Sequence, residues 1–404
     1  MTTARPAGPD LARMRVDRRT KLHDALAGQD VAAAVLLGAT NVRWATGARV
    51  VAADQGRASH FRNVAVVLNG DPVVHLFTHH PDGVPADHPA DHVHAGLDVE
   101  CDAGAGALVT FVGDRTGGGS GGRILLDEWT MALRRAWTAR LADAAPGDAA
   151  ASLMSEVRLC KTPDELACIR TAQWINEQAM LDVQAALRPG IRGVELSGLF
   201  LRRAFELGAH QNTVDPIWQA MPDSVAAGPG SVTGDLVFPT VTTAGALERG
   251  DVIWVDTGIT WEGYDSDFGR TWIVGATPSP AQQDQFRLWR RVVDAVLSVV
   301  RPGATGGDLT RAALVAAADG RRPWLAHLYL AHGIGVDSAE APFIGTDLGK
   351  EFDESIVLTP GMVLVLEPVA WTDGTGGYRA EEIVAVTDDG FRLLSDHPYG
   401  PYVA

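Results

Sequence analysis

The chain of 404 residues carries 50 acidic and 34 basic side chains, which gives a formal net charge of -16. This charge argues against nucleic acid and anionic membrane surfaces as partners, because both would repel the protein. Three sparse cysteines without metal-binding spacing favour a reducing compartment. No apolar run reaches the roughly 18 residues of a membrane span, and the N-terminus lacks the apolar centre of a secretory signal. We therefore expect a soluble, cytoplasmic protein, and the length predicts two domains.

The first third of the chain alternates helical and strand patterns. Residues 22–28 have helical character and lead into the apolar run 31–38, which predicts a buried strand. Residues 63–68 and 73–77 predict two further strands, joined by the turn sequence Asn69-Gly70-Asp71-Pro72. This alternation predicts an α/β domain.

A segment rich in alanine, glycine and proline predicts the domain boundary. It covers residues 142–151, so we place an N-terminal domain at residues 1–150 and a second domain at residues 151–404. The glycine-rich loop at 116–122 lacks the Gly-Lys-Ser/Thr ending of a phosphate loop and predicts no nucleotide site.

The second domain contains an internal repeat. Predicted helices at 167–187 and 286–300 each follow a helix-start sequence with proline at the first helical position. An Arg-Pro-Gly tripeptide follows each helix, at an offset of 113 residues, and the strand 250–256 recurs as 361–367 at an offset of 111. Two matches at nearly one offset favour a duplication, with two halves packed about a pseudo-twofold axis.

Each half carries a pair of acidic residues in a predicted hairpin. We expect Asp256 and Asp267 to sit opposite each other across one hairpin, and Glu367 and Glu381 across the other. Valine, isoleucine, leucine and tryptophan surround these residues, which predicts that the carboxylates are buried. Buried carboxylates that face each other need a cation or a proton between them. Together with His332, they predict a cage for two metal ions.

The segments that carry these residues resemble the signatures of the pita-bread metallopeptidases, the family of methionine aminopeptidase, aminopeptidase P, prolidase and creatinase. These segments are VDTGITWEGYDSDFGRT, HGIG, LEP and GGYRAEE. The run from Asn41 to Gly47 is similar to the N-terminal domain of the aminopeptidase P, prolidase and creatinase branch. The resemblance implies an α+β fold: an N-terminal α/β creatinase-like domain, followed by a pseudo-twofold pita-bread catalytic domain.

The resemblance also implies a ligand set for two divalent metal ions. It assigns the first metal to Asp267, His332, Glu367 and Glu381, and the second to Asp256, Asp267 and Glu381. One imidazole among oxygen ligands favours manganese or iron, with cobalt or zinc as alternatives. A hydroxide bridging the metals would attack an amide carbonyl. We expect Arg379 to orient a carboxylate by a charged hydrogen bond.

The accessory histidines of the family's peptidases are missing from this chain. Their places are taken by Pro239, Leu328 and Ala339, and His327 lies one position away from one of them. Loss of such an imidazole removes a general acid worth roughly 10²–10⁴ in rate. Standard Xaa-Pro cleavage would therefore need other side chains to take over the role of these imidazoles.

Two segments could supply these groups. Near His332, we predict catalytic roles for Asp337 and Glu340, together with Arg379. The polar and aromatic stretch 210–221 is the second source. The predicted substrate contacts are Asp215, Trp218 and His327.

The leading hypothesis is a dinuclear metal-dependent hydrolase of the Xaa-Pro peptidase type. It would cleave an amide or other C–N bond of a small peptide or peptide-like substrate, and the resemblance implies a homodimer. One alternative is a metal-dependent lyase similar to dimethylsulfoniopropionate lyase, although Gly258 stands where that enzyme carries an acidic residue. Another is a non-catalytic, peptidase-like binding protein, which the complete ligand set disfavours.

Overall fold

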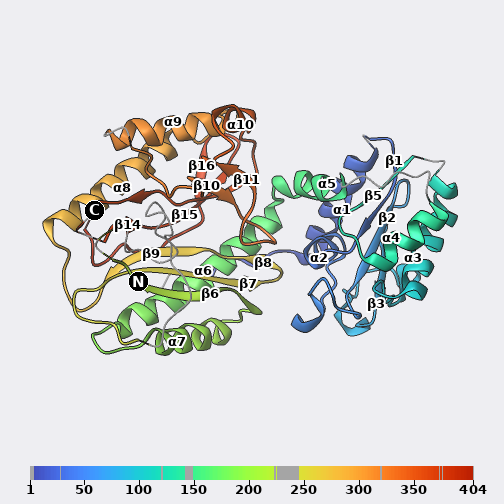
Figure 1. Cartoon of the computed structure of the whole chain (residues 1–404), viewed down its shortest axis with the longest axis horizontal. Coiled ribbons are helices and arrows are strands. Elements are labelled where there is room, and N and C mark those ends of the chain that lie inside the picture. The colour runs from blue at the N-terminus through green and yellow to red at the C-terminus, as the bar shows by residue number, and fades with distance from the viewer. Residues whose placement is uncertain are drawn as a thin grey trace. The chain divides into compact units, whose positions relative to one another are not determined.

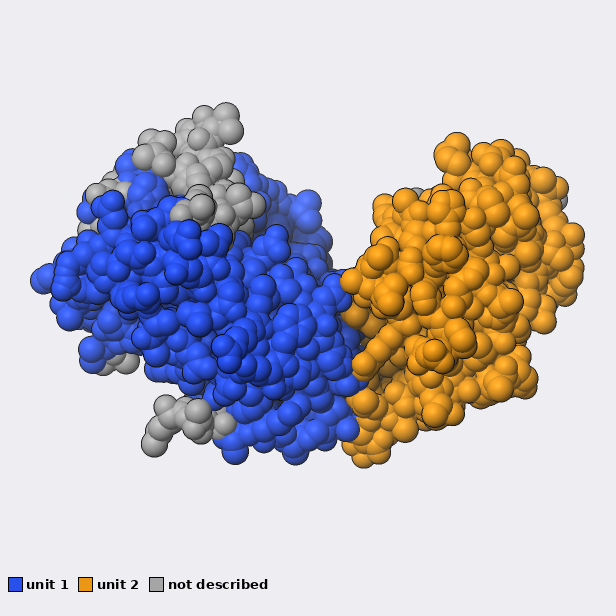
Figure 2. All heavy atoms as spheres, turned by 90° about the horizontal axis from the view of Figure 1, so that it is seen from below, with its two compact units in different colours: residues 1–9, 159–404 blue, residues 10–158 orange. Residues whose placement is uncertain are grey.

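The computed structural model describes residues 4–27, 29–119, 122–141, 149–222, 224, 245–318, 321–372, 374 and 376–403. The chain divides into one compact unit of residues 10–158 and another of residues 1–9 and 159–404 (Figure 2). The division thus falls after Arg158 rather than near residue 150. The reason is that the helix before the division packs with residues 10–158, where Arg158 Nη1 donates to Asn41 Oδ1 at 2.8 Å.

The unit of residues 10–158 is built on a mixed sheet with strand order β4-β3-β2-β1-β5. Strand pairs β1–β5 and β3–β4 are parallel, whereas β1–β2 and β2–β3 are antiparallel. The predicted buried strand and the predicted hairpin are both present. The elements are α1 (Leu11–Ala27), β1 (Val31–Leu36), α2 (Ala39–Thr46), β2 (Val64–Leu68), β3 (His75–Thr78), β4 (Val93–Ala95), α3 (Asp102–Arg115), β5 (Arg123–Leu126), α4 (Met131–Arg140) and α5 (Ala149–Leu159).

Alternation along the strands places the core of this unit. Ala33 and Val35 of β1 and Val64 of β2 point to the face that packs against Leu108 of α3 and Trp137 of α4. Side chains of a pleated strand alternate between faces, so this apolar set covers one side of the sheet.

The first half of the other unit is a helix pair packed on a sheet. Helices α6 and α7 pack their apolar faces on strands β6, β7 and β9, as Figure 1 shows in green and yellow. The elements are α6 (Pro163–Ala186), α7 (Gly193–Glu206), β6 (Gln211–Ala220), β7 (Val252–Trp261), β8 (Tyr264–Asp265) and β9 (Phe268–Ile273).

The second half repeats this plan with a sheet of strand order β11-β10-β12-β15-β16. Its helices α8 and α9 pack on that sheet, shown in orange and red in Figure 1. The elements are α8 (Pro280–Val299), α9 (Gly306–Ala317), β10 (Ala331–Gly333), β11 (Glu340–Ile344), α10 (Lys350–Ser355), β12 (Val363–Leu366), β13 (Val369–Ala370), β14 (Tyr378–Arg379), β15 (Glu382–Val386) and β16 (Phe391–Leu393).

The same local signals start corresponding helices in the two halves. Helix α6 begins at a capping box in which Thr162 and Glu165 exchange hydrogen bonds, and Ser279 and Gln282 form the equivalent box before α8. Each box satisfies backbone N–H groups that have no partner within the helix. The two halves therefore share their helix starts as well as the order helix, helix, hairpin, as the repeat predicted.

The two acidic hairpins differ in register. In the first, Asp256 pairs with Gly269, so Asp267 is a diagonal neighbour of Asp256. The prediction that Asp256 and Asp267 sit directly opposite each other was wrong: the partner of Asp256 lies two residues further along the chain, so both aspartates still face the same side of the hairpin. The tight turn falls on Glu262 and Gly263, both with positive φ (49° and 83°), rather than on Trp261 and Glu262. Two central residues with positive φ are typical of the twisted two-residue hairpin turn.

The second hairpin has the predicted register. Leu366 pairs with Glu382, and Val369 pairs with Arg379. This common register places Glu367 opposite Glu381, directly beyond the ends of β12 and β15.

Candidate metal centre

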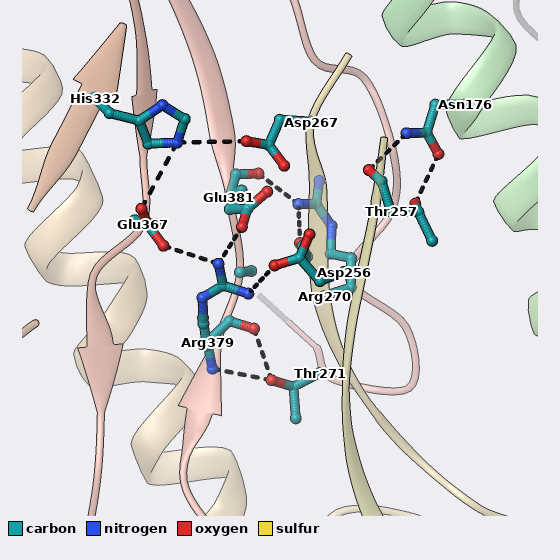
Figure 3. A network of polar contacts seen from close by, with 12 residues as sticks. Asn176, Asp256, Thr257, Asp267, Arg270, Thr271, His332, Glu367, Arg379 and Glu381 are labelled. Atoms are coloured by element: carbon teal, nitrogen blue, oxygen red, sulfur yellow. Dashed lines mark hydrogen bonds and ion pairs between the residues drawn. The ribbon is translucent and has the colours of Figure 1, made fainter. Parts of the chain in front are cut away.

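The structure gathers the predicted metal ligands in the interior of the unit of residues 1–9 and 159–404 (Figure 3). They come from five strands or strand ends, and each is less than a tenth exposed. The ligands are Asp256 on β7, Asp267 just before β9, His332 on β10, Glu367 just after β12 and Glu381 just before β15.

The imidazole of His332 faces the carboxylates with one nitrogen. Its Nε2 lies 3.3 Å from Asp267 Oδ2 and 3.7 Å from Glu367 Oε1. Its Nδ1 lies 2.9 Å from the carbonyl oxygen of Gly333, which can only accept a hydrogen bond. Nδ1 therefore carries the proton, which leaves the Nε2 lone pair for a metal.

Three of the carboxylates form the tightest cluster. Asp256, Asp267 and Glu381 each offer an oxygen within 4.8 Å of the others. Burial raises the pKa of Asp267 well above its usual range, and the neighbouring Asp256 raises it further. Burial likewise raises the pKa of Glu381 well above its usual range, with Asp267 as the next cause. Crowded, desolvated carboxylates of this kind favour either a proton or a cation.

Arg379 on β14 supplies positive charge to this cluster. Its Nη1 donates to Asp256 Oδ2 at 3.1 Å, and its Nη2 donates to Glu367 Oε2 at 2.8 Å and to Glu381 Oε1. Burial lowers the pKa of Arg379, but the carboxylates of Glu381, Glu367 and Asp256 outweigh it and hold that pKa well above the usual value. The guanidinium thus stays charged and holds three carboxylates in place, the contact expected from its position two residues before Glu381.

The donor set fits a pair of divalent ions. Among the described residues, the guanidinium that contacts these carboxylates offsets one of four negative charges, which leaves a deficit that two divalent cations can fill. The buried Oε2 of Glu381 has no hydrogen-bond partner in the described part of the chain. An oxygen left without a partner inside a protein is costly unless an ion binds it.

Buried polar contacts fix the backbone that carries the ligands. Asn176 on α6 donates to the carbonyl of Thr257 at 2.9 Å and to Ser266 Oγ at 3.0 Å, and Thr257 Oγ1 donates back to Asn176 Oδ1 at 2.9 Å (Figure 3). Thr257 follows Asp256, and Ser266 precedes Asp267. One amide side chain therefore positions both aspartates.

On the opposite side of the centre, two side chains of β9 hold the backbone around Glu381 by hydrogen bonds. Arg270 Nη1 donates to the carbonyl oxygen of Glu381 at 2.5 Å, and Thr271 Oγ1 donates to the carbonyl of Arg379 at 2.6 Å. These contacts join β9 of the first half to the chain around β14 of the second half. These contacts fix the position of the ligands of one half relative to those of the other half.

Gly269 leaves room for a ligand. A Cβ at this position would lie 2.6 Å from the carboxyl carbon of Glu381 and 2.7 Å from its Oε1. Because Gly269 pairs with Asp256, the missing side chain lets Glu381 lie across the strand next to that aspartate.

The residues predicted to act near His332 have other partners. Glu340, at the start of β11, is buried and forms an ion pair with Lys161 Nζ at 2.7 Å. A carboxylate held by a buried ammonium is a poor proton acceptor, so the structure favours an anchoring role for Glu340. Asp337 is half-buried on the bend before β11, where its carbonyl accepts from Gly335 N–H at 3.2 Å. The catalytic role of Asp337 stays a prediction.

The predicted substrate contacts lie apart from this cluster. Trp218 pairs with Val255 and packs in the core against α6 and α7, with its Nε1 donating to Ser197 Oγ at 2.9 Å. Since its neighbour Ile217 pairs with Asp256, Trp218 points to the opposite face of the sheet. The prediction that Trp218 binds substrate is therefore corrected to a core role.

Asp215 and His327 are both exposed. Asp215 lies where the register of β6 and β7 shifts, and Asn212 Nδ2 approaches its Oδ1 at 3.5 Å. His327 places its Nδ1 2.6 Å from Asp347 Oδ2, with 65% of its side chain exposed. His327 therefore points to solvent and to Asp347, and it lies in a turn with a positive φ of 60° rather than on a strand. The substrate contact of Asp215 stays a prediction.

Three positions lack the accessory histidines of the family's peptidases: Pro239, Leu328 and Ala339. Residues 238–240, including Pro239, lie outside the described residues. Ala339 is exposed on the bend before β11, and Leu328 is half-buried. No imidazole from the described residues replaces them beside His332.

Tyr329 is a polar residue near the centre that the sequence analysis missed. Its ring meets the His332 ring edge-on, with centroids 5.0 Å apart. Burial raises the pKa of Tyr329 well above its usual value, and the carboxylates of Glu367 and Asp267 raise it further. The phenol therefore keeps its proton at neutral pH. In the sequence, Tyr329 could have been recognised as a candidate by its position three residues before the predicted ligand His332.

Comparisons with known proteins find similarity to metallopeptidases. Residues 167–388 match the family model described as metallopeptidase family M24. An uncharacterized peptidase, YqhT, of Bacillus subtilis is 30% identical over 260 residues, covering 61% of this chain and 65% of that protein. The Xaa-Pro dipeptidase of Pyrococcus furiosus is 27% identical over 244 residues, covering 60% of this chain and 65% of that enzyme. Each match thus spans less than two thirds of the relative.

Solved structures share the fold over nearly the whole chain. Dipeptidase PepE from Mycobacterium ulcerans superimposes with a TM-score of 0.73 at 22% identity, covering 98% of this chain and 99% of that one. The prolidase from Pyrococcus horikoshii gives a TM-score of 0.72 at 18% identity, with 95% and 99% covered. The predicted α+β architecture, with a creatinase-like N-terminal domain and a pita-bread domain, is confirmed.

Proposed function

Because the chain belongs to metallopeptidase family M24, we propose that it is a dinuclear metal-dependent hydrolase of the Xaa-Pro dipeptidase type. The observation that carries this proposal is the convergence of four buried carboxylates and the Nε2 of His332 around Arg379. A purely structural core would not gather so many acidic groups, since each costs free energy to bury.

Five side chains would hold the two ions: Asp256, Asp267, His332, Glu367 and Glu381. When bound, divalent ions supply Lewis acidity that polarises an amide carbonyl and lowers the pKa of water. Manganese or iron is the proposed pair, because oxygen ligands outnumber the single imidazole nitrogen.

The chain's own residues prepare this site. Arg379 keeps three carboxylates oriented, and Gly333 fixes the proton of His332 on Nδ1. Tyr329 stays protonated beside the carboxylates, so its hydroxyl can donate a hydrogen bond to a substrate. We propose that Tyr329 takes over part of the work of the missing imidazoles.

Short peptides are the proposed substrates, and a cytoplasmic homodimer is the proposed state. Names of related proteins support the substrate class: Xaa-Pro dipeptidase in Pyrococcus furiosus and probable dipeptidase PepE in Mycobacterium tuberculosis. In the described part of the chain, none of the helices has both the length and the apolar character needed to cross a bilayer. Sedimentation of the purified protein measures the proposed dimer.

The alternative function as a lyase would call for an acidic side chain at residue 258, where this chain has glycine and little free space. A Cβ at Gly258 would lie 2.8 Å from Val214 Cγ2 and 3.0 Å from the carbonyl oxygen of Ser266. An acidic side chain at this position would therefore require the Val214 side chain and the Ser266 carbonyl to shift. The geometry therefore favours hydrolysis.

The test is turnover of a panel of Xaa-Pro and other dipeptides by metal-stripped and manganese-loaded protein. The expected result is cleavage by the loaded protein, with labelled oxygen from water in the carboxylate product. Asp267→Ala should abolish turnover and reduce bound metal, whereas Asp388→Ala, at an exposed turn, should change neither. Equal turnover by stripped and loaded protein, or an alkene product, would overturn the proposal.

A further inference from the structure

A second group of metal-binding side chains lies in the unit of residues 10–158. Asp71, His75 and His92 each offer a ligand atom, and these atoms lie within 4.8 Å of one another. Asp71 belongs to the turn between β2 and β3, His75 begins β3, and His92 directly precedes β4. None of these residues belongs to the carboxylate centre.

The parallel pairing of β3 and β4 brings the histidines to one face of the sheet. Leu76 pairs with Val93 and Phe77 with His94, so His75 lies beside His92 by the same register. The rings of His75 and His92 are stacked with centroids 4.5 Å apart. Helix α3 supports them through Phe111, whose ring meets His75 edge-on at 5.0 Å.

Distances within the group match a compact coordination shell. The Nε2 of His75 lies 3.2 Å from Asp71 Oδ2, and the Nε2 of His92 lies 3.3 Å from the same oxygen. Ligand atoms around tetrahedral zinc, with bonds of about 2.0–2.1 Å, are separated by about 3.3 Å. Each imidazole nitrogen therefore already lies at the required spacing from the shared carboxylate oxygen, and the ligand atoms of the two histidines lie within 4.8 Å of each other.

Each imidazole also has a partner for its other nitrogen. His92 Nδ1 lies 3.0 Å from Asp91 Oδ1, and His75 Nδ1 lies 3.0 Å from His94 Nε2. A metal-bound histidine donates its second N–H to such a partner, which orients the ring and leaves Nε2 free for the ion. The His75 side chain is only 8% exposed, and its Nε2 makes no well-aligned hydrogen bond to another described residue.

We propose that Asp71, His75 and His92 bind one divalent transition-metal ion, with zinc as the preferred ion. Two imidazole nitrogens and one carboxylate oxygen form a borderline donor set that suits zinc better than magnesium or calcium. Asp71 and His92 are partly exposed (28% and 18%), so water can fill a fourth position. The ion joins the β2–β3 turn to the edge strand β4 and so protects this edge of the sheet.

The experiment compares zinc uptake by chelator-stripped, full-length proteins. Wild type should bind one equivalent more than the double variant His75→Gln/His92→Gln, and circular dichroism checks that the variant is folded. His60→Gln is the matched control, because His60 pairs with Asp98 at 2.9 Å in the same unit but lacks a second histidine ligand. The control should bind as much zinc as wild type.

A second variant tests the site without changing a ligand. Asp91 is 80% exposed, so its replacement by alanine should leave folding intact. Loss of its contact to His92 should weaken zinc binding at this site about 10-fold. If the double variant does not fold, Asp71→Asn should show the same loss of one equivalent. Equal zinc stoichiometry in wild type and a folded ligand variant would overturn the proposal, whatever the outcome of the peptide assays.

Discussion

Arg379 donates from Nη1 to Asp256 Oδ2 at 3.1 Å, although the two residues are 123 positions apart in the chain. Asp256 belongs to the hairpin of the first half of the repeat, and Arg379 to that of the second. The counter-charge of one half therefore serves a carboxylate of the other. This contact makes the centre a property of the paired halves rather than of either hairpin.

Replacing Arg379 by methionine should destabilise the metal-free protein by about 3–5 kcal/mol, because buried carboxylates would lose their charged partner. Urea unfolding of the stripped protein measures this loss. Added manganese should restore part of it, since the ions offset the same charges. Arg392→Met, at an exposed position on β16, is the control and should unfold like wild type. A metal-free Arg379→Met protein as stable as wild type would show that the guanidinium is dispensable.

Replacing Gly269 by alanine should weaken metal binding about 10- to 100-fold, because the added Cβ would displace the carboxylate of Glu381. Titration of the stripped protein with manganese measures the affinity. Gly390→Ala is the matched control, since a Cβ there would meet nothing within 4 Å. Unchanged affinity in Gly269→Ala would mean that Glu381 does not need this space.

Replacing Tyr329 by phenylalanine should lower kcat about 10²-fold while the metal content stays the same, because the variant loses a hydrogen-bond donor to the reacting substrate but no ligand. Steady-state kinetics and metal analysis on one preparation separate the two effects. Tyr402→Phe removes a hydroxyl from a core tyrosine and should keep full activity. Wild-type kcat in Tyr329→Phe would remove Tyr329 from the reaction.

Metal binding should also stabilise the fold. At a free ion concentration 100 times Kd, each bound ion adds about 2.7 kcal/mol to the free energy of unfolding. Thermal unfolding should therefore show a higher Tm for manganese-loaded than for stripped wild type. Asp267→Ala should lose most of this difference, and Asp388→Ala should retain it. A Tm independent of manganese would argue against ions in the carboxylate centre.

The carboxyl group of Glu177 predicts a pH dependence of stability. Burial raises its pKa from 4.5 to about 7, against the opposing hydrogen bond from Asp396 N–H at 2.6 Å. The folded state thus binds this proton more tightly than the unfolded state. The contribution of Glu177 is therefore most favourable below the unfolded pKa, and it is lost as the pH rises through the folded value.

Glu177→Gln should remove this dependence, because glutamine can still accept from Asp396 but does not ionise. The free energy of unfolding of the variant, minus that of wild type, should rise by about 3 kcal/mol between pH 4.5 and pH 8. Urea denaturation of both proteins at several pH values measures this difference. All other titrating groups are the same in the two proteins, so their contribution cancels. A constant difference across this range would contradict the raised pKa.

Local sequence signals predicted the duplication, the helix starts and the acidic pair of each hairpin. Capping boxes act within one turn, and a hairpin joins residues that are close in the chain, so spacing alone placed Glu367 opposite Glu381. In the first hairpin the predicted turn was one residue too early and the predicted strand pairing two residues off, because Glu262 and Gly263, both with positive φ, form the turn. That conformation was decided by backbone geometry that residue spacing does not reveal.

Contacts between distant segments were decided only by the tertiary structure. Packing of the two halves brought Arg379 to Asp256 and placed the Lys161 ammonium beside Glu340. Strand pairing turned Trp218 into the core and placed His75 beside His92. The physical reason is that these partners meet through sheet register and helix packing over long separations, whereas a pattern along the chain records only which side chains are available.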